Sequence, residues 1–234
     1  MNLLTIECRR TRLKPYGRAA GVCGAVLLGF LYFFAAIPWL APADPDSRLF
    51  ADCGFLLHLV GLLALAAFTI LGGVAGARIV VEAYGGRQAL LLFACPVPRG
   101  RVLGAKLWLT AALPAGGMLV TGLAGLGVFL LSLRFWPQGP APLDAGGLAA
   151  ALWGLAAGSL TAGGLSLWAV WVGFRLRSVP ATVAAATVFA TLFCQILSPA
   201  WQLSWLRAGG LAAAVAGGAA AALSLRRQVE RVEV

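Results

Sequence analysis

Six long apolar runs constrain this chain more than any other feature of its sequence. Charged or Pro- and Gly-rich segments separate the runs, which cover about residues 19–41, 53–77, 107–133, 147–174, 180–198 and 206–225. An α-helix needs about 20 apolar residues to cross the hydrocarbon core of a bilayer, whereas a barrel strand alternates polar and apolar residues over about 10 positions. The sequence therefore predicts an all-α, polytopic membrane protein with six transmembrane helices, in which residues 1–234 form a single transmembrane domain.

The residue composition excludes an ordinary soluble domain. Of the 234 residues, 61% are hydrophobic and only 11% are charged, whereas a soluble domain has about 25% charged residues. The formal net charge of +10 is also found in proteins that bind nucleic acid, but here the basic residues lie in short segments between the apolar runs. That distribution sets the orientation of a membrane protein, so we expect no nucleic-acid partner.

The basic residues also predict which side of the membrane each segment faces. Six spans put both termini on one side, together with segments 78–106 and 175–178. Of the 18 Lys and Arg residues, only Arg48, Arg134 and Arg207 fall on the other side. Because cytoplasmic segments carry the excess of Lys and Arg, we expect both termini and segment 78–106 to be cytoplasmic. The expected location is the plasma membrane, and in particular the inner or cytoplasmic membrane of a bacterium.

The N-terminal segment, residues 1–18, has the pattern of a short interfacial helix. Leu3, Leu4, Ile6 and Leu13 are set among basic residues, and a basic amphipathic helix of this kind lies in the headgroup layer of a membrane. A frayed basic tail would give the same pattern. The first apolar run is too long for a signal peptide and lacks a clear cleavage site, so we expect this span to stay in the mature protein.

The spans carry little of the chemistry that an enzyme needs. No Asp, Glu, Lys or Arg lies near the middle of a span, where ionisable residues usually mark function. The only histidine, His58, lies one turn into the second span without an acidic partner, so we expect it to be hydrogen-bonded or interfacial rather than catalytic. Ser159 and Ser166 do not form the nucleophile motif G-x-S-x-G, and residues 100–106, GRVLGAK, fail the spacing of a phosphate-binding loop.

The cysteines and the lack of a buried carboxylate also argue against chemistry in this chain. The five cysteines have no C-x-x-C spacing and give no metal or disulfide framework. A proton-coupled transporter needs a buried carboxylate or a pair of broken helices, and the spans lack the carboxylate. We therefore expect no catalytic, cofactor-binding or metal-binding residue in this chain, and any energy for transport must come from a partner.

Glycine and proline positions predict how the spans pack. Small residues four apart let two membrane helices approach closely, either inside one bundle or between subunits. Such pairs occur at Gly17 and Gly21, at Gly72 and Gly76, and at Gly154 and Gly158. In the third span Pro114 removes a backbone hydrogen bond, so a kink or a break is expected there.

Segment 78–106, between the second and third spans, is the longest stretch that cannot lie wholly in lipid. It carries six charged residues around a short apolar island, residues 90–93, and two prolines. An apolar helix flanked by charges is the usual anatomy of an interface anchor, because the apolar side chains fill a cleft and the charges fix the orientation. We interpret the segment as a cytoplasmic loop whose short helix docks onto another protein. The alternative is a solvated loop whose charges only set topology.

The same segment resembles the signature region of ABC-2-type transporter permeases, the membrane subunits of a class of ATP-driven exporters. In that family the loop carries a glutamate, a glycine four residues on, an apolar helix, and then a P-[VI]-x-R-x-x-[ILV]-x-x-x-K run into the third span. The residues that match, or that supply the apolar helix, are Glu82, Gly86, Leu91, Phe93, Pro96, Arg99 and Lys106. Arg87 and Pro98 depart from the pattern, at positions where threonine and serine are common.

The resemblance implies a set of partners. The loop helix would be a coupling helix that presses into a groove on a separate ABC ATP-binding subunit, present in two copies, which would bind ATP and Mg²⁺. A second permease copy would make a homodimer in the membrane lipid, with residues 1–18 as an interfacial elbow helix. The substrate, exported between the two copies, would be hydrophobic or amphipathic, such as a peptide antibiotic or a lipid-like molecule. Lys106 would lie at the inner interface with its ammonium group extended to the headgroups.

One alternative from a different class remains open at this point. The chain could be a membrane scaffold or assembly protein that recruits a cytoplasmic partner through the same loop and transports nothing. An intramembrane enzyme fits less well, because the spans carry so few ionisable groups.

Overall fold

The structure is a computed structural model of the chain, and it describes residues 14–42, 45–82, 99–136, 139–141, 143–201 and 204–231. The described residues form helices joined by short connections, without a β-strand. The long helices are α2 (Lys14–Leu40), α3 (Cys53–Gly76), α6 (Arg99–Leu133), α7 (Ala145–Leu176), α8 (Val179–Leu197) and α9 (Ser204–Arg231). The short elements are η1 (Pro45–Ala51), the π-helical η2 (Ala77–Val81) and η3 (Ser198–Trp201).

Six of these helical stretches are long and apolar enough to cross a membrane: Lys14–Leu40, Cys53–Val81, Val102–Leu133, Ala145–Leu176, Val179–Ala200 and Trp205–Arg227. This confirms the prediction of an all-α chain with six candidate membrane spans. Most of the helices begin or end a few residues beyond the apolar runs, because polar residues at a helix end keep backbone hydrogen bonds while their side chains reach the interface.

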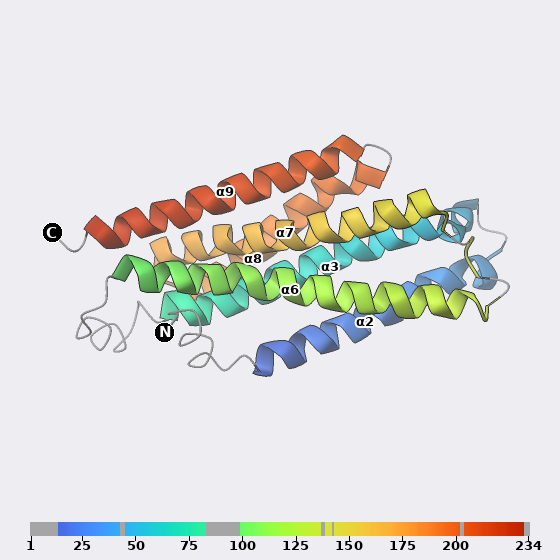
Figure 1. Cartoon of the computed structure of the whole chain (residues 1–234), viewed down its shortest axis with the longest axis horizontal. Coiled ribbons are helices and arrows are strands. Elements are labelled where there is room, and N and C mark those ends of the chain that lie inside the picture. The colour runs from blue at the N-terminus through green and yellow to red at the C-terminus, as the bar shows by residue number, and fades with distance from the viewer. Residues whose placement is uncertain are drawn as a thin grey trace.

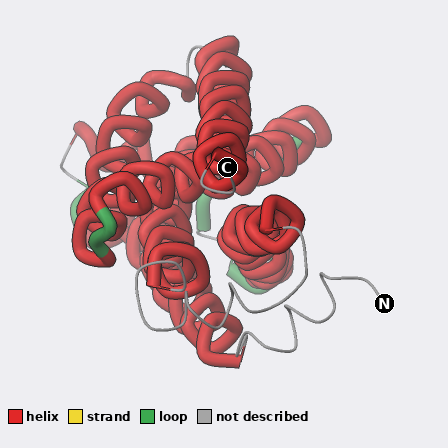
Figure 2. Tube along the Cα trace, turned by 90° about the vertical axis from the view of Figure 1, so that its left-hand side faces the viewer, coloured by secondary structure: helices red, strands yellow, loops and turns green. Residues whose placement is uncertain are grey.

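The helices form an elongated bundle with α7 at its centre. Helix α7 packs against α9, α3, α6 and α8, whereas α2 packs mainly against α3 and α6. Figure 1 shows η1, η3 and the connection from α6 to α7 at one end of the bundle, and the turn from α7 to α8 and the end of α9 at the other. Figure 2, viewed along the bundle, shows the helices grouped around one another rather than in a single row.

Glycine allows the closest helix contacts of the bundle. A Cβ built on Gly72 of α3 would lie 2.7 Å from Pro114 Cγ, and one built on Gly76 would lie 2.7 Å from Thr110 Cγ2. This pair therefore packs inside the bundle, as the four-residue spacing allowed. A Cβ on Gly17 or Gly21 would meet nothing within 4 Å, so that pair makes no helix contact in the described chain.

The break that was one of the two expected outcomes at Pro114 is absent, since α6 runs through it as one continuous helix. Pro114 is buried, and its ring lies in the space that Gly72 leaves on α3. In a membrane helix the neighbouring helices can accommodate the backbone group that proline frees. The helical hydrogen bonding therefore continues through this position.

Candidate functional site

The inner end of the bundle, defined here as the end that holds η2, the start of α6 and the end of α9, contains the described part of the predicted coupling segment. The expected loop, residues 78–106, was too long: residues 78–82 continue the helix begun by α3, and Arg99–Lys106 belong to α6. Apolar residues such as Ile79, Val80 and Leu103 are buried there, which explains why the helices extend past the charged positions that had marked the loop.

The predicted coupling residues divide between described and undescribed parts of the chain. Gly86, Leu91, Phe93, Pro96 and the expected coupling helix lie outside the described residues, as do residues 1–13 of the expected N-terminal interfacial helix. Residues 14–18 form the start of α2. Of the remaining coupling residues, Glu82 is exposed directly after η2, and Arg99 is the first residue of α6.

Lys106 does not extend to the headgroups as expected. Its side chain is only 5% exposed, and its Nζ donates a hydrogen bond to the carbonyl oxygen of Ile79 at 3.2 Å. The prediction was wrong because it treated Lys106 as the edge of a span, whereas α6 begins seven residues earlier and buries this turn against η2. A π-helical turn changes the hydrogen-bond register of a helix and often lies at functional sites. Lys106 thus joins the two helices that flank residues 83–98.

The surface of the inner end is basic. The exposed side chains at this end include Arg78 after α3, Arg175 and Arg177 at the end of α7, and Arg226 and Arg227 near the end of α9. The guanidinium of Arg175 also lies 4.6 Å from the ring centroid of Trp171, a cation–π contact. The clustering agrees with the sequence assignment of this end to the positive-inside side, although the orientation itself stays a prediction.

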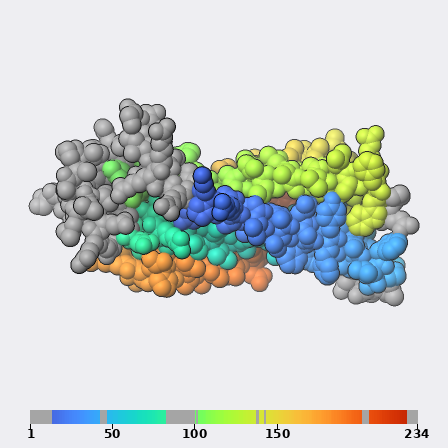
Figure 3. Space-filling view, turned by 90° about the horizontal axis from the view of Figure 1, so that it is seen from below, coloured from blue at the N-terminus to red at the C-terminus, as the bar shows by residue number. Residues whose placement is uncertain are grey.

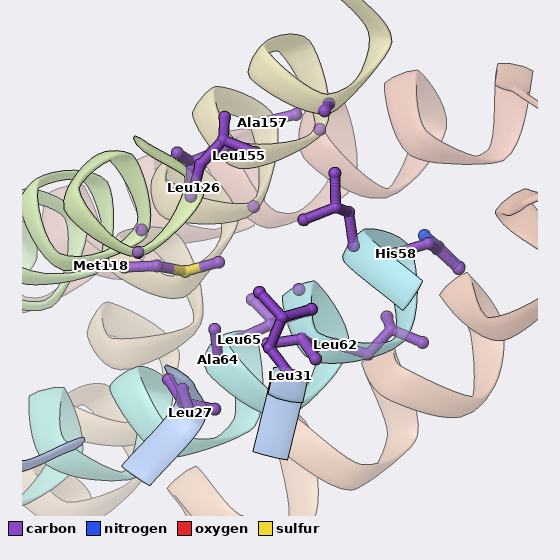
Figure 4. Close-up of a pocket in the computed structure, with 18 of the residues that line it drawn as sticks. Leu27, Leu31, His58, Leu62, Ala64, Leu65, Met118, Leu126, Leu155 and Ala157 are labelled. Carbon is purple, nitrogen blue, oxygen red and sulfur yellow. The ribbon is translucent and has the colours of Figure 1, made fainter. Parts of the chain in front are cut away.

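The other half of the bundle, called the outer half here and ending at η1 and η3, contains a pocket between α2, α3, α6 and α7 with a cavity of about 180 Å³. Figure 4 shows the side chains of Leu27, Leu31, Leu65, Met118 and Leu155 around it. Its lining is mostly Leu, Ala and Gly, and the ends of α8 and α9 contribute Leu197 and Arg207. On α3 the lining residues run from Gly54 to Leu65, so the pocket extends from the outer end of this helix toward its middle.

One end of the pocket is polar. His58 Nε2 lies 3.2 Å from the carbonyl oxygen of Ser198, and His58 Nδ1 lies 3.4 Å from Arg207 Nη2. A carbonyl oxygen only accepts, so Nε2 carries the proton and donates, and Nδ1 accepts from the guanidinium. This arrangement confirms the prediction that His58 is hydrogen-bonded. Sequence reasoning counted Arg207 with the outer connection and gave it no role; α9 begins at Ser204, so Arg207 lies in its first turn.

The two serines considered as nucleophiles have structural partners. Ser159 Oγ donates to the carbonyl oxygen of Ala156 at 2.8 Å, and Ser166 Oγ donates to that of Ala162 at 2.7 Å. Hydroxyl groups in membrane helices commonly bond their own backbone in this way. Within the described ranges, no cluster of three or more His, Cys, Asp or Glu side chains has the arrangement of a metal site.

Fold and site together define a helical protein with six candidate membrane-spanning helices, a basic inner end and an apolar pocket in the outer half. No protein-family model matches the chain, and no solved structure matches it. The chain is similar to the uncharacterized protein YcbO of Bacillus subtilis (strain 168), with 27% identity over 210 residues that cover 87% of each chain. The likeness therefore extends over nearly the whole bundle and assigns no activity.

Proposed function

We propose that this chain is the membrane-spanning subunit of an ATP-driven transporter of the ABC-2 type, in which residues 83–98 contact a separate cytoplasmic ATPase. The observation that carries the proposal is the spacing of the charged and apolar residues around this loop. Glu82 stands directly before it, Arg99 directly after it, and Lys106 two turns into the following helix. In this proposal the chain hydrolyses no ATP itself and exports a hydrophobic or amphipathic molecule.

The packing at the base of the loop supports a mechanical role. The bond from Lys106 Nζ to the Ile79 carbonyl joins η2 to α6. Buried apolar residues on both elements, Ile79, Val80, Leu103 and Leu107, belong to one cluster. A force on the loop would therefore act on two helices held together at their inner ends, rather than on a loose connection. A solvated loop that only sets topology would not require a buried lysine at its base, because burying a charge is costly.

The decisive experiment is purification of the tagged protein from its native membranes in mild detergent, with mass spectrometry of the proteins that accompany it. We expect a P-loop ATPase in stoichiometric amount. Replacing both Glu82 and Arg99 with alanine should reduce the ATPase recovered by about tenfold or more, since charge-assisted interface bonds are worth about 1.5–3 kcal/mol. In a reconstituted complex the same double variant should separate ATP hydrolysis from transport.

Arg227→Ala is the matched control, because Arg227 is an exposed arginine of the same end but lies outside the loop. It should leave the recovery of the ATPase unchanged. Recovery of no ATPase, even after chemical cross-linking in the membrane, would exclude the proposal and favour a scaffold role. Equal loss in the double variant and in Arg227→Ala would show that the charge of the inner end matters and the loop does not.

A further inference from the structure

The outer pocket combines an apolar body with a charged end. Its cavity of about 180 Å³ is larger than the ~150 Å³ apolar cavity that takes up a benzene-sized ligand. Along α3 the lining runs from Gly54 to Leu65, which at 1.5 Å per residue is about 16 Å. That length is roughly half the thickness of a bilayer core. The pocket can therefore hold much of a medium-length alkyl chain whose head stays at the outer end.

Arg207 supplies a positive charge that the described residues leave uncompensated. Its Nη2 donates to neutral His58, its Nε is buried without a hydrogen-bond partner among the described residues, and no described carboxylate forms an ion pair with it. Asp52 and Asp144 cap α3 and α7 at this end of the bundle, where Asp52 accepts from Gly54 N at 2.8 Å and Asp144 from Gly147 N at 2.7 Å. A guanidinium offers five N–H donors, and the one hydrogen bond that Arg207 makes within the described part of the chain, to His58, uses one of them.

The guanidinium also has a fixed direction. A Cβ built on Gly154 of α7 would lie 3.3 Å from Arg207 Nη1, so the absence of a side chain at this position leaves room for the charged group beside α7. His58, itself bonded to the Ser198 carbonyl, holds the other side of the guanidinium. A lipid-facing arginine near a helix end usually extends freely to the headgroups. Arg207 instead lines the pocket, together with the leucines of α2 and α3.

We propose that this pocket binds an amphiphile with a single anionic head group, which pairs with Arg207 while its alkyl chain lies along Leu27, Leu31 and Leu65. Carboxylates and phosphates both suit a guanidinium, because two N–H groups can bond two oxygens at once. A cationic head group would be repelled, and a neutral one would leave the guanidinium without an ion-pair partner among the described residues. The site lies within one copy of the chain and does not depend on an ATPase. The binding proposal is therefore tested independently of the proposed function.

The binding test uses the purified full-length chain in lipid nanodiscs and a decanoic acid that carries a diazirine in its alkyl chain. After illumination, mass spectrometry of peptides maps the attachment sites. We expect attachment within residues 54–65 and 118–126, which line the pocket. Unlabelled decanoate or decyl phosphate should compete for attachment, and decyltrimethylammonium should not. The stronger of the two anionic competitors identifies the preferred head group.

Two matched pairs of variants separate the pocket from general lipid contact. Gly61 lines the pocket and Gly127 does not, and a Cβ on either would meet nothing within 4 Å. Gly61→Phe should therefore fill the pocket and abolish attachment, whereas Gly127→Phe should leave it unchanged. Arg207→Gln should lower attachment by about tenfold or more, the loss expected for a hydrogen-bonded charge, and Arg207→Lys, which keeps the charge but loses the bidentate geometry, should lower it less than Arg207→Gln does.

Size-exclusion chromatography serves to test whether each variant is folded. Gly61→Leu replaces Gly61→Phe if the protein does not tolerate the larger side chain. The proposal is overturned if attachment is spread over the lipid-facing surface and is insensitive to both Gly61 and Arg207 variants. It is also overturned if the cationic amphiphile competes as well as the anionic ones, because the charge of Arg207 would then play no part.

Discussion

Replacement of Gly164 by alanine tests whether the contact between α7 and α9 holds the bundle together. A Cβ on Gly164 would contact the carbonyl oxygen of Ala214, and it would lie 2.8 Å from Ala214 C and 3.3 Å from Val215 N. All three atoms belong to the backbone of α9. Gly218 faces the same place from the other helix, because its own Cβ would lie 3.0 Å from Gly164 Cα. No side chain can turn away to make room, so α9 must shift.

The size of the effect follows from these distances. Carbon atoms pack at about 3.5–4.0 Å, so a contact at 2.8 Å requires the helices to separate by about 1 Å. A gap of that size loses a quarter to a half of the attraction between the facing atoms, and overpacking of this kind costs about 1–3 kcal/mol. Alanine recovers about 0.5–1 kcal/mol over glycine inside a helix. We expect Gly164→Ala to destabilise the protein by about 1–2 kcal/mol.

The control is Gly116→Ala in α6, where a Cβ would meet nothing within 4 Å and the residue is exposed. It should be neutral or stabilising by about 0.5–1 kcal/mol. Stability can be measured by titrating the detergent-solubilised protein with dodecyl sulfate and following tryptophan fluorescence. Equal stability of the two alanine variants, or a Gly164→Ala protein as stable as the wild type, would refute the close contact between α7 and α9.

Two further predictions concern the inner end and the orientation. Lys106→Met keeps the apolar stem and removes the bond to the Ile79 carbonyl. Because the substitution also removes the cost of burying the charge, we expect the free energy of unfolding to change by no more than about 1 kcal/mol. A loss of several kcal/mol would contradict the expectation that these two effects offset each other. In a cysteine-free background, Phe135→Cys, at a position that is 80% exposed, should react with an impermeant maleimide in intact cells. Arg177→Cys should react only after lysis, and the reverse pattern would contradict the positive-inside assignment.

The sequence predicted the helices well because a membrane span is a nearly local property. Length and hydropathy alone decide whether a stretch can cross a bilayer, so six apolar runs became six helices. The ends were less accurate, since a span continues as long as its backbone can be satisfied and its side chains buried. Lys106 shows this limit: its charge indicated an interface, whereas the burial of the neighbouring Leu103 and Leu107 keeps that turn inside the bundle.

The polar end of the pocket could not be predicted from the sequence, because three helices contribute to it. His58 lies in α3, Ser198 follows α8, and Arg207 lies in the first turn of α9, so their contact depends on how α3, α8 and α9 pack. One signal was present: an arginine at the start of an apolar run, directly after Trp205 and Leu206. An ionisable residue at such a position is expected to have a polar partner, because removing its charge from water is costly.

Helices α3 and α6 both run from the outer pocket to the inner end. From the outer end, α3 and η2 carry first the pocket lining, then Gly72 and Gly76, and finally Ile79. In the same direction α6 carries the pocket lining, then Pro114 and Thr110, and finally Lys106. Figure 3 shows α2 lying along the outside of this part of the bundle, beside α6.

The glycine contact therefore lies between the pocket and the bond from Lys106 to Ile79. Packed helices shift as stiff bodies, because interiors are close-packed and resist continuous deformation. A displacement of the inner ends of α3 and α6 would then rotate both helices about Gly72 and Pro114 and change their separation at the pocket. If residues 83–98 contact an ATPase as proposed, the bond from Lys106 to the Ile79 carbonyl would make the two inner ends move together, so that a force applied there would reach the pocket.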